Sequence, residues 1–181
     1  MGSVDGVNLA QSTVLLFAAV CIVGILVCHP PSAEGAAATK PFTTFEDFYP
    51  LYMQQHSQPL TKLLHAVGTC LALFNVAAEP RLAVAGAWGS AVGLVTFRFT
   101  LTFEHGIAEF VLAVGTVIIM TRVLTGSVRP ALRAIILGYS FAWAAHHFVE
   151  INRPATFIYP TFSLWGDFRM LSELVADGYE L

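Results

Sequence analysis

A chain of 181 residues is long enough for one domain with a short appendage. Hydrophobic residues make up 56% of it and charged residues only 12%. Soluble domains contain about 25% charged residues, so the composition excludes an ordinary soluble domain and favours a membrane protein. The net charge of −3 offers no excess of basic residues, so we expect no nucleic-acid partner.

The first apolar segment contains no charged residue from Gly6 to Cys28. Its length reaches the roughly 20 residues that cross a bilayer, so one interpretation is an uncleaved anchor over about residues 7–28. The other is a cleaved signal peptide. Against it, the preceding residues hold Asp5 and no Lys or Arg, whereas a signal peptide usually begins with a positive region.

The next segment, residues 29–41, is rich in small residues and proline and is predicted to be a linker. We therefore divide the chain into an N-terminal extension, residues 1–41, and a membrane domain, residues 42–181.

The domain opens with FTTFEDFYPLYMQQH, which predicts a helix. Thr43 or Thr44 is suited to cap it, and acidic residues stand in its first turn. Aromatic side chains recur with i, i+3, i+4, i+7 spacing, at Phe45, Phe48, Tyr49 and Tyr52. Such a stripe fits a helix lying in the membrane interface as well as it fits a helix packed into a protein core.

Four further apolar runs follow, each of 15 or 16 residues: Leu63–Ala78, Leu82–Phe97, Gly106–Thr121 and Ala131–Ala145. These lengths are a little short for a full span, but Arg98 and Arg122 can snorkel and extend the ends. Small residues spaced four apart between Gly86 and Gly93 allow helices to approach closely. We predict an all-α fold: a polytopic membrane helical bundle with four core transmembrane helices, an N-terminal hydrophobic segment and an interfacial helix.

This topology gathers the histidines. If the four runs cross in turn, the segment before the first, the turn between the second and third, and the end of the fourth share one face of the membrane. Five of the six histidines lie in these segments, namely His56, His65, His105, His146 and His147. Imidazole suits iron, zinc, copper or nickel, and a His-plus-carboxylate set with open positions suits non-haem Fe(II) and O₂ chemistry.

The candidate metal ligands are His56, His65 and His146. Pro59 between the first two makes one unbroken helix unfavourable, so a turn can bring both toward one point. Glu150 follows His146 by four residues and shares its helix face, which makes it a candidate catalytic carboxylate. Adjacent helical residues point about 100° apart, so two neighbouring histidines rarely bind one ion.

Asn152 and Arg153 allow two interpretations. They are either a helix stop, with Arg153 paired to Glu150, or substrate-binding residues in which Arg153 holds a carboxylate through a bidentate contact.

Two long motifs carry a resemblance to a known family. FYPLYMQQHSQPLTKLLHAVGT (Phe48–Thr69) and GYSFAWAAHHFVEINRPATFIYPTFSLWGDFRM (Gly138–Met170) resemble the Mpo1-like family, and the resemblance covers roughly residues 42–178. Fungal members of that family are multi-pass endoplasmic reticulum proteins and Fe(II)-dependent dioxygenases of fatty acid α-oxidation.

The resemblance implies an enzyme that uses O₂ to convert a 2-hydroxy fatty acid into CO₂ and the acid one carbon shorter. On this sequence it implies Fe(II) held by His56, His65 and His146, with Glu150 in the second motif. It also implies an endoplasmic reticulum membrane location if the source is eukaryotic. Binding by His105 or His147, and zinc in place of iron, stay open.

The alternative hypothesis is non-enzymatic: a lipid-binding or scaffolding membrane protein in which the histidines pack and pair. Metal content separates the two, because only the first requires a stoichiometric ion.

Overall fold

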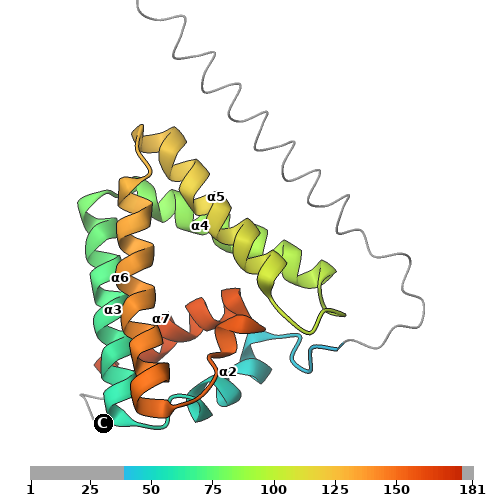
Figure 1. The fold of residues 1–181 in the computed structure, drawn as a ribbon. Coiled ribbons are helices and arrows are strands. Elements are labelled where there is room, and N and C mark those ends of the chain that lie inside the picture. Colours follow the sequence, from blue (N-terminus) through green and yellow to red (C-terminus); the bar gives the residue numbers. More distant parts are fainter. Residues whose placement is uncertain (1–38, 177–181) are drawn as a thin grey trace, which may run out of the picture.

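The computed structural model describes residues 39–176, and every regular element within them is helical, which confirms the all-α prediction (Figure 1). The expected anchor over residues 7–28 lies outside the described residues, as does His29. The elements are α2 (Phe45–Gln54), α3 (Pro59–Ala78), α4 (Arg81–Phe99), α5 (Ile107–Thr125), α6 (Arg129–Ala145), a π-helical turn η1 (His146–Glu150), a 3₁₀ turn η2 (Ala155–Phe157) and α7 (Pro160–Ala176).

Local signals account for where several helices begin and end. Thr44 caps α2, since its hydroxyl oxygen accepts a hydrogen bond from the Asp47 N–H at 3.2 Å. Of the two residues predicted to cap this helix, Thr43 and Thr44, the structure therefore uses Thr44. Pro59 occupies the first turn of α3, where no N–H is needed. Gly126 ends α5 with φ 77°, a left-handed conformation that strains residues with a side chain.

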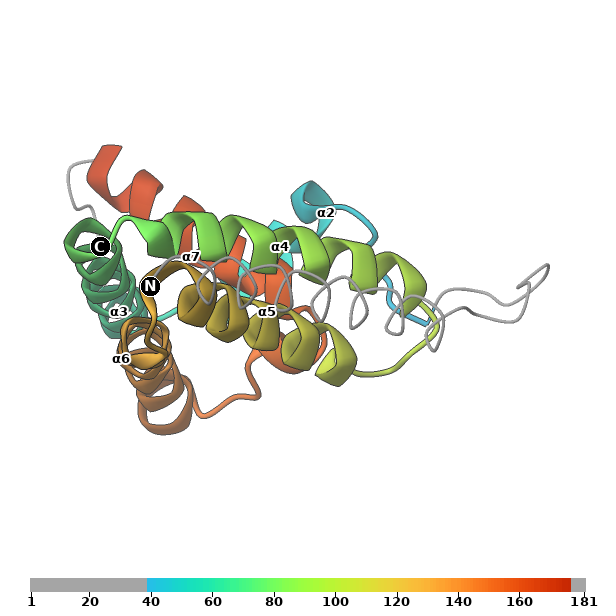
Figure 2. The ribbon, with the colours of Figure 1, turned by 90° about the horizontal axis from the view of Figure 1, so that it is seen from above.

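The long helices form two antiparallel pairs, α3 with α6 and α4 with α5 (Figures 1 and 2). The pairs meet where α3 turns into α4 and α5 into α6, and they diverge from there (Figure 1). Gly68 lets α3 approach α6, because a Cβ there would lie 2.9 Å from the Gly138 carbonyl oxygen. Gly89 does the same between α4 and α5, where a Cβ would lie 2.4 Å from Val117.

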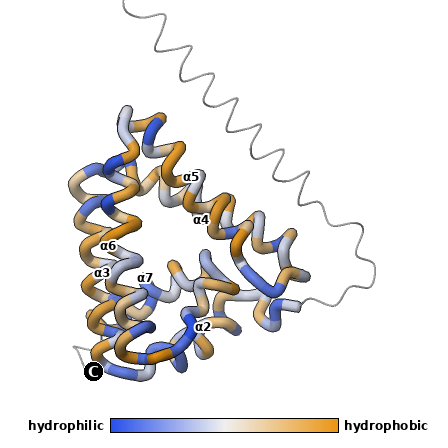
Figure 3. Tube along the Cα trace, in the orientation of Figure 1, coloured by the Kyte–Doolittle hydropathy of each residue, from blue (hydrophilic) through white to orange (hydrophobic). Residues whose placement is uncertain are grey.

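Three described helices are long and apolar enough, by length and composition, to cross a membrane: α3, α4 and α5. Hydrophobic residues run along them and along α6, with hydrophilic residues at the turns (Figure 3). The fourth expected span, α6, has 17 residues and continues into η1. These findings are compatible with a membrane protein, and the number of spans stays a prediction.

Helices α2 and α7 lie across the open end of the two pairs (Figure 1). The aromatic stripe of α2 is packed there: Phe48, Tyr49 and Tyr52 are buried in one cluster with Tyr159 and Phe162. Of the two interpretations of the stripe, the structure therefore shows core packing.

The chain enters this core at Lys40, which our division of the sequence assigns to the linker but which is only 2% exposed. The backbone N–H of Lys40 donates to the Leu101 carbonyl at 3.0 Å. The Lys40 ammonium lies 3.7 Å from a carboxylate oxygen of Glu109, which is 1% exposed. The other Glu109 oxygen accepts a hydrogen bond from the Thr161 N–H at 2.8 Å, at the start of α7.

Candidate metal centre

Three histidines from three separate segments converge. His56 lies in the turn between α2 and α3, His65 in the second turn of α3, and His146 at the start of η1. One ring nitrogen from each lies within 4.8 Å of the other two. The ring planes cross at 76° to 86° and the ring centres are 4.3 to 5.1 Å apart, so edges rather than faces meet in the middle. All three side chains are buried.

An oxygen atom fixes the outer nitrogen of each ring. Carbonyl and carboxylate oxygens only accept hydrogen bonds, so each Nδ1 must carry a proton, and in a neutral ring Nε2 then keeps its lone pair. The three contacts are His56 Nδ1 to the Tyr52 carbonyl oxygen at 2.6 Å, His65 Nδ1 to Asp167 Oδ1 at 2.7 Å, and His146 Nδ1 to Asn152 Oδ1 at 2.6 Å.

The inner nitrogens are suited to a metal ion. Within the described part of the chain, the Nε2 atoms of His56 and His65 are buried without a hydrogen-bond partner. Leaving a buried polar atom unpaired costs free energy, and these two atoms belong to rings whose nitrogens converge on one point, an arrangement that suits a shared ligand. Burial and the neighbouring His65 lower the pKa of His56 to about 3, and burial lowers the pKa of His146. Both rings are therefore neutral at pH 7, the form that binds a metal.

Tyr52, which was predicted only as part of the aromatic stripe, supports the rings of both His56 and His65. The Tyr52 hydroxyl donates at 2.6 Å to the same Asp167 oxygen that accepts from His65. Its ring stacks on His56 with centres 4.0 Å apart. Burial raises the pKa of Tyr52 well above its usual range, so the hydroxyl stays a donor. Gly166 makes the room, since a Cβ there would lie 2.8 Å from the Tyr52 ring.

Two signals in the sequence would have found this support. Tyr52 precedes His56 by four residues, one helical turn, and Gly166-Asp167 belongs to the second motif that carries the family resemblance.

A strained backbone turns His146 inward. The π-helical turn η1 is a rare conformation that often marks functional sites. It leaves His147 exposed and His146 buried. Ile151 ends it with φ 53° and ψ 41°, a left-handed conformation that is unfavourable for a β-branched residue. This reversal returns Asn152 to His146, whose carbonyl oxygen also accepts from the Asn152 N–H at 3.2 Å.

Glu150, the candidate catalytic carboxylate, makes its hydrogen bonds with the segment that begins α3. Glu150 accepts hydrogen bonds from the Gln58 N–H at 2.7 Å and the Ser57 hydroxyl at 3.0 Å, so it caps the start of α3. Desolvation by itself raises the pKa of Glu150, but these hydrogen bonds outweigh it and lower the pKa below its usual value. A catalytic role for Glu150 stays a prediction.

Asn152 and Arg153, predicted together, are separated by the fold. The Asn152 amide holds His146 and donates to the Gln55 carbonyl at 3.0 Å. Arg153 is exposed, with its guanidinium 5.0 Å from the centre of the Phe157 ring. His105 is also exposed, in the turn between α4 and α5.

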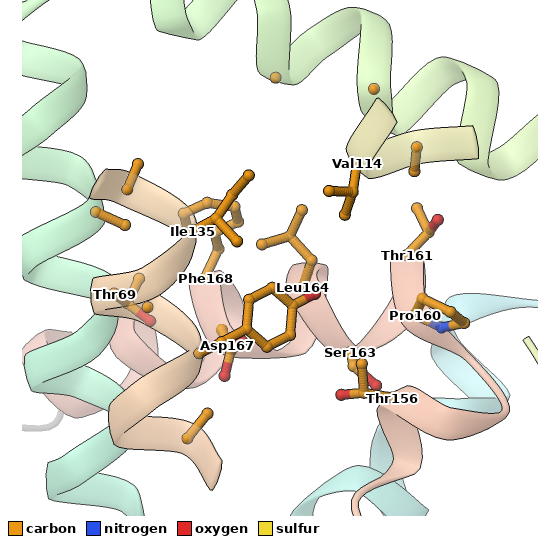
Figure 4. A pocket seen from close by; sticks show the side chains of 18 of the residues that line it. Thr69, Val114, Ile135, Thr156, Pro160, Thr161, Ser163, Leu164, Asp167 and Phe168 are labelled. Carbon is orange, nitrogen blue, oxygen red and sulfur yellow. The ribbon is translucent and has the colours of Figure 1, made fainter. Parts of the chain in front are cut away.

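The histidines open onto a cavity of about 460 Å³ between the two helix pairs. This volume is within the roughly 300 to 1,000 Å³ typical of ligand sites. Val114, Ile135 and Leu164 give it apolar walls, and Asp167 and Ser163 lie at its α7 side (Figure 4). Arg153 is not among the described residues that line it.

Comparison with protein families matches residues 42–178 to the model described as 2-hydroxy-palmitic acid dioxygenase Mpo1-like. The chain belongs to the Mpo1-like family. This confirms the resemblance inferred from the two motifs, and the three histidines fall inside the matched region. Comparison with curated proteins gives no significant match, and comparison with solved structures gives none either.

Proposed function

We propose that this Mpo1-like protein is a membrane-embedded, Fe(II)-dependent dioxygenase that shortens 2-hydroxy fatty acids by one carbon. One observation carries the proposal: three buried imidazoles from three separate segments bring one nitrogen each to within 4.8 Å of the others, at the end of an apolar cavity. The family description names a 2-hydroxy-palmitic acid dioxygenase, which supplies the reaction class. The endoplasmic reticulum membrane is the location we propose if the source is eukaryotic.

His56, His65 and His146 would hold the ion. Three imidazoles leave coordination positions for a substrate and O₂, and suit Fe(II) and Zn(II) alike. Bound Fe(II) supplies the redox chemistry that O₂ requires and that zinc, which has no redox chemistry, does not. The reaction R–CH(OH)–COOH + O₂ → R–COOH + CO₂ + H₂O balances without another reductant, because the substrate provides all four electrons that O₂ takes up.

The protein's own residues position and shield the site. Asp167 and Asn152 fix the rings of His65 and His146 by accepting from their Nδ1 atoms. The apolar walls of the cavity keep water away from the reacting carbon. Glu150 and Asn152 are proposed to act by holding the site, Glu150 through the start of α3.

The test is turnover by the purified full-length protein loaded with Fe(II) in detergent. We expect CO₂ and the shortened acid from a 2-hydroxy fatty acid, and neither product from the matching fatty acid without the hydroxyl. His56→Ala and His146→Ala should lose iron and turnover together, while His105→Ala, on an exposed histidine, keeps both.

A well-folded, iron-loaded sample without turnover contradicts the proposal. The lipid-binding alternative gains support if the protein binds fatty acids, contains no stoichiometric metal and tolerates all three substitutions His56→Ala, His65→Ala and His146→Ala.

A further inference from the structure

We propose that the cavity between the helix pairs holds the substrate's alkyl chain along its length, and that Gly86 sets how long a chain it accepts. The inference rests on the proposed function for the position of the head group, at the histidines. It adds the direction of the chain and the residue that limits it.

The cavity follows the helices from the histidines toward the turns where the two pairs meet. On α6 its lining recurs every three or four residues, from His146 back to Ala131. Fifteen residues of α-helix rise about 22 Å, which exceeds the roughly 15 Å that one leaflet of a 30 Å hydrocarbon core offers an acyl chain. A long unbranched chain therefore has room to lie parallel to α6.

The two ends of the cavity differ in polarity. Asp167, which accepts a hydrogen bond from His65, lies with Ser163 on the α7 side of the cavity (Figure 4). The Ser163 hydroxyl oxygen is buried and, within residues 39–176, has no hydrogen-bond partner. The opposite end is lined by Val76, Leu82 and Ala131. A carboxylate fits the first end and a methyl terminus the second.

Gly86 stands in the wall near that apolar end, on the lining face of α4. Its lining neighbours Leu82, Ala83, Gly89 and Ser90 fall one turn before and after it. A Cβ at Gly86 would meet nothing within 4 Å, unlike one at Gly89, which is packed against α5. The missing side chain at Gly86 is therefore not required for helix packing. Its effect is to leave space in the cavity.

Gly115 provides a matched control. It lies inside α5 as Gly86 lies inside α4, both are partly buried, and a Cβ at Gly115 would also meet nothing within 4 Å. Gly115 does not belong to the described lining of the cavity. A large side chain at Gly115 therefore tests the cost of losing a helix glycine without filling the cavity.

The experiment measures chain-length preference with full-length protein in detergent. Saturated unbranched fatty acids of graded length displace a fluorescent fatty acid, and 2-hydroxy acids of the same lengths are assayed for turnover. We expect Gly86→Leu to weaken binding and turnover of the longest acids roughly tenfold or more, since one misfitting methylene is worth about that much. The shorter acids should be unaffected, and Gly115→Leu should behave as wild type.

Equal length preference in Gly86→Leu and wild type overturns the inference, as does the same shift in Gly115→Leu. If Gly86→Leu does not fold, Gly86→Ala must show a smaller shift in the same direction, and no shift overturns the inference. Binding that depends on chain length, without turnover, supports the cavity as the site of the alkyl chain and refutes the proposed function. Turnover whose chain-length preference is the same in the Gly86 variants and in wild type supports the proposed function and refutes the role of Gly86 in the cavity.

Discussion

Helix α7 separates two buried polar centres that have opposite characters. At its start, Glu109 meets both the Lys40 ammonium and the Thr161 N–H. One to two turns further on, Asp167 belongs to the candidate metal centre, where the Nε2 atoms of His56 and His65 have no hydrogen-bond partner among the described residues. The first centre is an ion pair enclosed by protein, with the Lys40 ammonium 3.7 Å from Glu109, whereas the second faces a cavity.

The difference shows what distinguishes a structural buried charge from a binding site. The Lys40 ammonium also lies 5.2 Å from the centre of the Phe97 ring and 5.8 Å from that of Tyr159, so protein surrounds it. Such a pair ties the N-terminal segment to α5 and α7. The histidines use their outer nitrogens for orientation and keep the inner ones free, as metal ligands do.

Removal of the His65 ring should have the largest effect on metal affinity, and it tests the contrast between the candidate metal centre and the Lys40–Glu109 pair. His65→Ala takes away a proposed ligand, so metal affinity should fall by more than the roughly ten- to hundredfold that loss of an outer hydrogen-bond partner costs. The metal-free protein should keep its helix content, because among residues 39–176 the hydrogen bond of the His65 side chain is to Asp167, and its ring meets only the other two histidine rings. Elemental analysis and circular dichroism measure the two quantities. Stoichiometric metal in His65→Ala contradicts the assignment.

Breaking the other centre should damage stability and leave metal binding intact. Glu109→Gln keeps an acceptor for the Thr161 N–H but leaves the Lys40 charge buried without its partner. We expect the free energy of unfolding to fall by about 3–5 kcal/mol. Denaturant titration in detergent measures it, and the double variant Lys40→Met/Glu109→Gln should recover much of the loss. Loss of metal from the folded fraction would show that the two centres are not independent.

A neighbouring pair of substitutions tests the role of the outer hydrogen bonds. Asn152→Ala releases the ring of His146, so metal affinity should fall roughly ten- to hundredfold. Arg153→Ala, one residue along, should leave metal affinity unchanged, because Arg153 is exposed over Phe157. Calorimetric metal titration compares the two. Equal losses of metal affinity in the two variants would indicate a general disturbance of the loop. A weaker substrate affinity in Arg153→Ala would support the predicted contact between Arg153 and the substrate carboxylate.

The smallest effect is expected at Glu150. Glu150→Gln weakens the cap of α3 and should cost about 1 kcal/mol at neutral pH. The folded-state pKa of Glu150 lies below its ordinary 4.5, so its stabilisation is present above that value and is lost as pH falls through the lower folded pKa. Melting temperatures of variant and wild type should therefore converge in acid. Lost turnover at unchanged stability would instead support the predicted catalytic role.

Several features were predictable because their causes are local. Composition and hydropathy indicated apolar helices, and the cap at Thr44 and the helix start at Pro59 follow from short-range backbone chemistry. The alternation of apolar runs predicted only a shared face for five histidines. The structure brings three of them together, His56, His65 and His146, and leaves His105 and His147 exposed.

The sequence by itself determined a helical, apolar chain of the Mpo1-like family and the three imidazoles that it gathers. Tertiary structure decided which nitrogen of each ring is free, that Asp167 and Tyr52 hold the rings, and that Glu150 turns toward α3. The physical reason is range: helix propensity and capping act within a few residues. The Tyr52–Asp167 hydrogen bond joins positions 115 residues apart and exists only once α2 has packed on α7.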